Sequence, residues 1–528
     1  MPPPRREPAL LPRPTRLVRR SGRFSLDTTT AVRATEGAEG AADLPRLLLT
    51  PATGLPLAPS AAGAVTLTVD PHLGGLGQEG YGLTGSPPRV LLRAARPTGL
   101  LRGVQTIRQL LPPEALAPAP GTVRHEHGEL PCVEITDVPR RPWRGLMIDV
   151  ARHFHDAATL RRHIDLLALH ELNVLHLHLT DDQGWRMPFP SHPRLTSVGA
   201  HRAGTMTGPD GTTGLDGRPH GGAYTGAELT DPVDHAARRG VRVVPEIGMP
   251  GHVRAALAAY PRLGNRPDRT LDVWTRWGVC DTVLGVHDEV LDFVRAVLHE
   301  VMEVFPSPYI HLGGDECPTT EWERSPSARA RATAEDLPGP AALHGWLLGR
   351  AGDFLTEHGR RPVGWAEDGA PLPPGFTVMS WRDPAHAAAA VNGGHDVVLA
   401  HHRTTHLDHA QDDAPDGPPS QPGPVVDLRT VHAGDPEPET PAVGGGRVLG
   451  TQAQIWTEFA PGAADLDRLA YPRLCALADR AWTGPTAWAD FTSRLGAHMP
   501  RLDALGVRHH RPTAPRTAAA PASAAPSA

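Results

Sequence analysis

The chain has 528 residues, too many for one ordinary hydrophobic core, so we expect one large domain and one smaller one. The formal net charge of −6 and the lack of a basic stripe with interleaved aromatics argue against a nucleic-acid-binding protein. No run of about 18 apolar residues predicts a membrane span. The sequence contains no lysine, which excludes Schiff-base, pyridoxal-phosphate and P-loop lysine chemistry.

Both ends of the chain have a biased composition. Residues 1–20 are rich in proline and arginine and predict a disordered leader, and residues 511–528 predict a disordered Ala/Pro/Ser tail. Because the start lacks the apolar core of a signal peptide, we expect a cytoplasmic protein, unless a leader has been trimmed or the start site is misassigned.

The four cysteines show no CxxC spacing, so they resemble neither a disulfide framework nor a structural zinc site. They are Cys132, Cys280, Cys317 and Cys475. A Cys280–Cys317 bridge is one interpretation, and unpaired buried thiols are the other.

The region 21–140 predicts a small α+β domain. Its short extended runs include Ala64–Asp70 and Arg89–Ala95, and an amphipathic helix follows near Leu100–Leu111.

From Arg144 onward, short apolar strands alternate with helices such as Ala157–Leu169 and Glu289–Val304. The predicted strands are Leu146–Val150, Asn173–Leu179, Val241–Ile247, Tyr309–Leu312, Pro362–Trp365, Thr377–Trp381, Asp396–Ala400 and Leu449–Ile455. Eight strands with helical crossovers predict a (β/α)8 TIM barrel over residues 141–510, so the fold class is α/β. Two insertions, 200–224 and 411–447, are either lids over a substrate or disordered spacers.

In such a barrel the chemistry lies at the carboxyl ends of the strands. The fourth strand ends at Gly313-Gly314, which lets a ligand approach the backbone, and Asp315 and Glu316 follow. Along an extended chain these two side chains point opposite ways and can address two atoms of one substrate. Adjacent carboxylates also raise each other's pKa, which can keep one of them protonated as a general acid. A solvated acidic turn is the alternative, although the preceding apolar strand disfavours it.

Polar residues and tryptophans follow the other strands. The candidates are Arg152, Asp181, His252, Trp365, Trp381, His406, Asp408, Trp456 and Glu458. Indole rings pack on the C–H faces of a pyranose, while charged side chains bind its hydroxyl groups, so this set is typical of a sugar pocket. A single tryptophan is more often a core residue than a pocket residue, and it is the shared position at strand ends that favours the pocket.

With these residues, the chain resembles the β-N-acetylhexosaminidases of glycoside hydrolase family 20. The matching blocks are Arg144–Phe154, Asn173–Arg186, His220–Thr225, Pro245–His252, His311–Glu316, Val363–Trp365 and Gln454–Glu458. The N-terminal region, with Gly80-Tyr81 and residues 101–106, resembles the small α+β domain that precedes such barrels.

The resemblance implies an exo-acting enzyme that removes terminal GlcNAc or GalNAc with retention of configuration. The substrate's own 2-acetamido oxygen would attack the anomeric carbon to give an oxazolinium intermediate. By the same resemblance, Glu316 is the general acid and base, and Asp315 holds the acetamido N–H and balances the positive charge. No cofactor or metal is implied. The expected partner is a small oligosaccharide or glycan, and the chain is a monomer or a homodimer.

Roles for the remaining candidates also come from the resemblance. Arg152 would bind O3 and O4 of the terminal sugar, and Glu458 would bind O4 and O6, with Asp408 beside them. The pocket walls would be Trp365, Trp381 and Trp456. Asp181 with His252 would tune Glu316, although Asp181 also fits a helix N-cap or turn position.

Two positions depart from the family pattern. His406 stands where the family usually has a tyrosine that donates to the acetamido oxygen, and Gly248 replaces the usual acidic residue. An imidazole can also donate, but its reach and pH response differ.

Two rival functions remain. A metal-dependent hydrolase is suggested by His176 and His178, which point the same way from one strand, although core histidines fit there too. A carbohydrate-binding barrel that has lost catalysis is suggested by the two departures.

Overall fold

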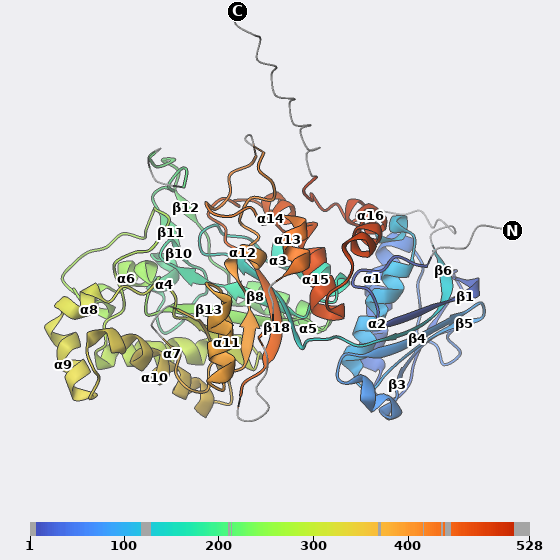
Figure 1. Cartoon of the computed structure of the whole chain (residues 1–528), viewed down its shortest axis with the longest axis horizontal. Coiled ribbons are helices and arrows are strands. Elements are labelled where there is room, and N and C mark those ends of the chain that lie inside the picture. The colour runs from blue at the N-terminus through green and yellow to red at the C-terminus, as the bar shows by residue number, and fades with distance from the viewer. Residues whose placement is uncertain are drawn as a thin grey trace, which may run out of the picture.

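The computed structural model describes residues 7–117, 128–209, 212, 214–367, 371–414, 417–434, 437–438 and 445–511. Figure 1 shows a small N-terminal domain, coloured blue, beside a larger barrel domain, so the expected α/β barrel preceded by an α+β domain is confirmed. Among the residues described, no helix is both long and apolar enough to cross a membrane. The predicted tail at 512–528 lies outside these residues.

The N-terminal domain is a six-stranded sheet in the order β1-β6-β4-β5-β3-β2, with helices α1 and α2 packed together beside it. The strands are β1 (Arg16–Ser25), β2 (Val32–Ala34), β3 (Val65–Val69), β4 (Tyr81–Ser86), β5 (Arg89–Ala94) and β6 (Glu129–Asp137). The helices are α1 (Glu39–Thr53), α2 (Pro97–Leu110) and the 3-10 turns η1 (Pro71–Leu76) and η2 (Pro113–Leu116). Helix α2 begins earlier than predicted because Pro97, which lacks an N–H, suits the first turn of a helix.

The prediction of a disordered leader is wrong for residues 7–20. Leu10 and Leu11 are buried, and the N–H of Leu11 donates to Oε1 of Gln109 at 3.0 Å. Strand β1 begins at Arg16 and pairs with β6. The Pro/Arg-rich composition predicted disorder because it does not show that two buried leucines and one paired strand are enough to hold this segment in place. Residues 1–6 lie outside the described part of the chain.

The barrel closes in the order β7-β8-β13-β14-β15-β16-β17-β18, and all neighbouring pairs are parallel. Its strands are β7 (Trp143–Asp149), β8 (Val174–His178), β13 (Arg242–Met249), β14 (Tyr309–Gly313), β15 (Arg361–Trp365), β16 (Thr377–Ser380), β17 (Val397–Leu399) and β18 (Val448–Ile455). All eight predicted strands are therefore confirmed, with ends shifted by a few residues.

Helices surround the barrel, and the last helix reaches back to the N-terminal domain, where α16 packs on η2. The helices are α3 (Ala157–Leu169), α4 (Arg194–Ser197), α5 (Gly226–Ala237), α6 (Arg254–Ala259), η4 (Pro261–Leu263), α7 (Asp288–Val304), α8 (Thr320–Arg324), α9 (Pro326–Ala334), η5 (Pro340–Ala342), α10 (Leu343–Glu357), α11 (Pro384–Asn392), α12 (His402–Thr405), α13 (Leu428–Ala433), α14 (Ala463–Ala470), α15 (Arg473–Thr483) and α16 (Trp488–Ala504). Short strand pairs lie in the loops: β9 (Thr180–Asp181) with β10 (Gly184–Trp185), and β11 (His201–Arg202) with β12 (His220–Gly221).

The described parts of both insertions are structured. Insertion 200–224 contains the β11–β12 pair, and insertion 411–447 contains α13. Nε2 of Gln421 donates to Oε1 of Glu458 at 3.4 Å, so the second insertion reaches the carboxyl end of the barrel. A wholly disordered spacer is therefore excluded for the described residues of 411–447.

A buried ion cluster joins the two domains. Glu79, in the loop before β4, lies 2.8 Å from Nη2 of Arg102 on α2 and 2.7 Å from Nη2 of Arg144 on β7. Both guanidinium groups are fully buried. Burial raises the pKa of Glu79, but the two arginines outweigh it and hold that pKa at about 2. The carboxylate is therefore ionised at neutral pH.

Candidate active site

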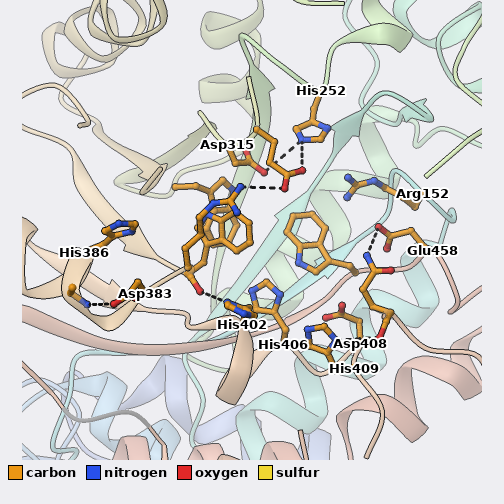
Figure 2. Close-up of a pocket in the computed structure, with 17 residues that line it drawn as sticks. Arg152, His252, Asp315, Asp383, His386, His402, His406, Asp408, His409 and Glu458 are labelled. Atoms are coloured by element: carbon orange, nitrogen blue, oxygen red, sulfur yellow. Dashed lines mark hydrogen bonds and ion pairs between the residues drawn. The ribbon is translucent and has the colours of Figure 1, made fainter. Parts of the chain in front are cut away.

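The carboxyl end of the barrel holds a cavity of about 570 Å³ (Figure 2). Its lining residues are Arg152, His252, Asp315, Glu316, Trp365, Trp381, Arg382, Asp383, Ala385, His386, His402, His406, Asp408, His409, Gln421, Trp456 and Glu458. Every predicted site residue lines this cavity except Asp181, which lies behind Arg152 and His252. Seven different strands contribute residues to one pocket, six through the loops that follow them and β15 through its last residue, Trp365, as expected for the functional face of a barrel.

Asp315 and Glu316 leave β14 through a tight turn. Gly313, Gly314 and Glu316 have φ values of 72°, 97° and 46°, in the left-handed region. A Cβ at Gly313 would stand 3.0 Å from the Cα of Gly248, so the neighbouring strand also requires a glycine there. The expectation of an extended chain that points the two carboxylates apart is wrong, because the turn brings both into one cavity.

The two adjacent carboxyl groups differ in acidity. Burial, followed by the charges of Glu246 and Glu316, raises the pKa of Asp315 to about 6. Burial also acts to raise the pKa of Glu316, but the positive charges of His252 and Arg382 beside it lower that pKa overall. One carboxyl group of the pair has a raised pKa, as predicted, but this group is Asp315 and not Glu316, the predicted general acid.

His252 connects the acidic pair to two further carboxylates. Its Nε2 lies 3.6 Å from Oε2 of Glu316 and 3.8 Å from Oδ2 of Asp315. Its Nδ1 lies 3.1 Å from Oδ2 of Asp182 and 3.3 Å from Oδ1 of Asp181. Burial opposes the charged form of His252, but these carboxylates raise its pKa well above the usual value. The imidazole is therefore an imidazolium at neutral pH. Sequence reasoning missed Asp182, although it is adjacent to Asp181.

Arg152 is held rigidly for recognition. Its Nη2 lies 2.8 Å from Oδ2 of Asp181, its Nη1 lies 3.5 Å from Oδ2 of Asp149, and its Nε donates to Gln183 at 3.0 Å. Its Cζ also stands 4.9 Å from the centre of the Trp456 ring. The ion pair with Arg152 decides against a simple N-cap role for Asp181. That carboxylate couples the acid network to the predicted sugar-binding arginine.

The three tryptophans surround the centre of the pocket. The ring centres of Trp365 and Trp456 are 6.1 Å apart, and Nε1 of Trp365 donates to Oε1 of Glu246 at 2.8 Å. Trp381 stacks on His406 with 12° between the ring planes. The Cζ of Arg382 lies 4.1 Å from the centre of the Trp381 ring, and its Nη2 lies 3.4 Å from Oε1 of Glu316. Sequence reasoning missed Arg382, since an arginine beside a tryptophan carries no signal by itself.

The wall opposite His252 is formed by His406, Asp408 and His409, with Glu458 beside them (Figure 2). Gln421, which also lines the cavity, contacts both His409 and Glu458. Burial, moderated for Glu458 by the charge of Arg152 and for Asp408 by that of Arg473, raises the pKa of both carboxyl groups to about 7. Among the described residues, Nε2 of His406 and both carboxylate oxygens of Asp408 have no hydrogen-bond partner. Polar atoms buried without a partner are costly, so this wall is suited to a polar ligand.

His176 and His178 lie below this pocket and do not line it. Nδ1 of His178 is 2.6 Å from Oε2 of Glu246, and Nε2 of His176 is 3.0 Å from the same oxygen. These contacts support the interpretation as core histidines that share a buried carboxylate. They do not support a substrate-facing metal pair. All four cysteines are free thiols, so Cys280 and Cys317 do not form a disulfide.

The sequence matches two family models. Residues 142–485 match the catalytic domain of glycosyl hydrolase family 20, and residues 7–138 match domain 2 of the same family. The second match begins at residue 7, the first residue that the structure describes.

Curated relatives agree with these matches. A beta-hexosaminidase of Porphyromonas gingivalis is 38% identical over 85% of this chain, which spans 56% of that longer protein. A beta-hexosaminidase of Akkermansia muciniphila is 35% identical over 83% of this chain and 86% of its own length.

Solved structures share the fold. A GH20 exo beta-N-acetylglucosaminidase from Vibrio harveyi, in complex with N-acetylglucosamine, superposes with a TM-score of 0.82 at 31% identity, covering 96% of this chain and 78% of that one. A Streptomyces plicatus N-acetyl-beta-hexosaminidase gives a TM-score of 0.81 at 32% identity, covering 96% of both chains.

Proposed function

Because this chain belongs to glycosyl hydrolase family 20, we propose that it is an exo-acting β-N-acetylhexosaminidase that releases terminal GlcNAc or GalNAc with retained configuration. One observation carries the proposal. Asp315 and Glu316 lie against the same imidazole, that of His252, on the wall of a cavity with three tryptophans and one buried arginine. That set supplies a charge-balancing group, a proton donor and a sugar-binding surface together.

Binding of the terminal sugar uses the walls of the pocket. The pyranose packs between Trp365, Trp381 and Trp456, which exclude water and orient the acetamido group. Its hydroxyl groups bind Arg152, Asp408 and Glu458. The raised pKa values of Asp408 and Glu458, about 7, suit this role because either group can donate or accept a hydrogen bond near neutral pH.

The first chemical step is attack of the acetamido carbonyl oxygen on the anomeric carbon, while the bond from that carbon to the leaving oxygen breaks. Asp315, as a carboxylate, accepts a hydrogen bond from the acetamido N–H. Its negative charge stabilises the cationic oxazolinium more than the neutral substrate.

Glu316 delivers a proton to the leaving oxygen. In the free site Glu316 is ionised and the proton resides on His252, 3.6 Å away. Substrate covers the pocket and displaces water, which favours transfer of that proton to Glu316 and onward to the glycosidic oxygen. In the second step Glu316 removes a proton from water as the water attacks the anomeric carbon, and the acetamido group is restored.

The test is to follow the reaction of a β-linked aryl N-acetylglucosaminide by proton NMR. We expect the β-anomer of the sugar to appear first, and a thiazoline analogue of the cyclised intermediate to inhibit. Two results would contradict the proposal: equal hydrolysis of the corresponding glucoside, which lacks the amide, or no inhibition by the thiazoline. Binding of the substrate without product release would instead favour a carbohydrate-binding barrel.

A further inference from the structure

Three side chains on the wall opposite His252 form a compact group of potential metal ligands. His406, Asp408 and His409 each offer one ligand atom, and these atoms all lie within 4.8 Å of one another. Their exposed fractions are 5%, 4% and 6%. Figure 2 shows the three side chains together, on the other side of the pocket from Asp315. The group lines an open cavity, so an ion from solvent can reach it.

The two imidazoles present ring nitrogens that a metal ion could use. Nδ1 of His409 lies 3.2 Å from the carbonyl oxygen of Gln421, which can only accept a hydrogen bond, so the other ring nitrogen of His409 is left to accept. Nε2 of His406 has no hydrogen-bond partner among the described residues. Metal-binding histidines typically donate one ring N–H to a carbonyl and present the other nitrogen to the ion.

We propose that His406, Asp408 and His409 bind a zinc ion that competes with the sugar for the pocket. Two imidazoles and one carboxylate are a typical ligand set for zinc, with the fourth position left to water. Hard ions such as Mg²⁺ prefer oxygen ligands and would bind this set poorly.

Competition follows from which atoms are used. The unpartnered Nε2 of His406 and carboxylate of Asp408 are also the atoms available to sugar groups on this wall. Since the same lone pairs cannot serve both, zinc and sugar exclude each other. The competition rests on the substrate roles proposed above, whereas zinc binding does not.

The test is isothermal titration of the full chain with Zn²⁺ alone, with and without saturating N-acetylglucosamine. His409→Gln removes one ligand, and we expect a loss of zinc affinity of at least about tenfold. His402→Gln is the matched control, because His402 lines the same pocket, hydrogen-bonds the carbonyl of Trp381 at 3.1 Å and is not in the group. It should leave zinc affinity within about twofold. Mg²⁺ at the same concentration should give no measurable binding.

Each outcome decides a separate point. Equal zinc affinity in wild type and His409→Gln overturns the zinc site. This result would also be obtained if zinc bound only to the buried group of His170, Cys475 and His498. A loss of affinity in His409→Gln but no effect of sugar keeps the zinc site and contradicts the sugar-binding role of this wall. A loss in His409→Gln together with weaker zinc binding in the presence of sugar supports the proposal in full. Steady-state inhibition by zinc should then raise KM and leave kcat unchanged.

Discussion

Nε2 of His252 lies 3.6 Å from Oε2 of Glu316, and in the free site this pair is an imidazolium beside a carboxylate. The arrangement differs from a general acid that stores its own proton in an apolar pocket. The proton needed by the leaving group begins on His252, which Asp181 and Asp182 hold from the other side. Loss of the imidazole should therefore affect the same chemical step as loss of the acid.

Glu316→Gln should lower kcat/KM by about 10²–10⁴-fold on chitobiose, because an amide cannot protonate a poor leaving group. On an aryl glycoside with an acidic phenol the loss should be much smaller. His252→Gln should show the same selective loss on chitobiose but to a lesser degree, since Glu316 can still take a proton from water. Steady-state kinetics on both substrates measure this. Equal losses on the two substrates would contradict the proton-delivery role of the pair.

Asp315→Asn should lower kcat on every substrate, by about 10²–10³-fold, whatever the leaving group. The reason is that the neutral amide no longer balances the positive charge of the oxazolinium. The variant should also bind the thiazoline inhibitor more weakly than wild type. Wild-type rates in this variant, confirmed as folded by circular dichroism, would exclude the role given to Asp315.

The pH profile of kcat/KM should fall on the acid side through about pH 6. The pKa of Asp315 is about 6 in the free site, and its role needs the carboxylate, so protonation below that pH removes the active form. On the alkaline side, activity should persist until the raised pKa of His252 is passed. Asp408→Asn is the control: its rate falls, but the acid limb should stay near pH 6. Movement of that limb in the control would assign it to Asp408.

Asp408→Asn should stabilise the protein at high pH. The pKa of Asp408 in the folded protein is about 7, above its ordinary value of 3.8. Its contribution to the free energy of unfolding is therefore fully present below about pH 3.8, where the carboxyl is protonated, and is lost as pH rises through 7. Removing the carboxyl should raise the melting temperature at about pH 8 more than at about pH 5. Each unit of pKa shift is worth about 1.4 kcal/mol. Asp353→Asn is the control, because Asp353 is exposed, and it should leave the melting temperature unchanged at both pH values. An equal gain at both pH values would point to packing and not to charge.

Much of this site could be predicted from the sequence because barrel strands end at one face. Once eight strands were recognised, the residues after them had to converge, and Arg152, Trp365 and Glu458 do so. The direction of the pKa shifts could not be predicted in the same way. The lowered pKa of Glu316 depends on His252, 64 residues earlier in the chain, whose distance only the closed barrel defines.

Amino-acid composition is a poor guide to order where only a few residues hold a segment in place. Residues 7–20 look disordered, yet Leu10 is buried in the core of the N-terminal domain and Leu11 in the core of the barrel. Gln421 lies in a Pro/Gly-rich insertion and still reaches Glu458. In both segments, one or two contacts with residues distant in the sequence outweigh the local composition, which by itself predicts disorder.

Glu79→Gln should strongly destabilise the chain without altering its chemistry. The change leaves Arg102 and Arg144 buried without their carboxylate, and breaking a buried ion pair costs about 3–5 kcal/mol. Glu134→Gln is the matched control, because Glu134 also contacts two arginines but on the exposed sheet surface, where solvent screens such pairs and they contribute little to stability. Urea unfolding of both variants measures the difference, and kcat/KM of the folded protein should stay at the wild-type value in each.

The pKa of Glu79 is lowered to about 2 from 4.5, so its contribution to the free energy of unfolding is fully present above about pH 4.5 and is lost as pH falls towards 2. The gap between wild type and Glu79→Gln should therefore narrow in that acidic window. A gap that is small at neutral pH, or unchanged by acid, would mean that the two domains are joined by packing alone.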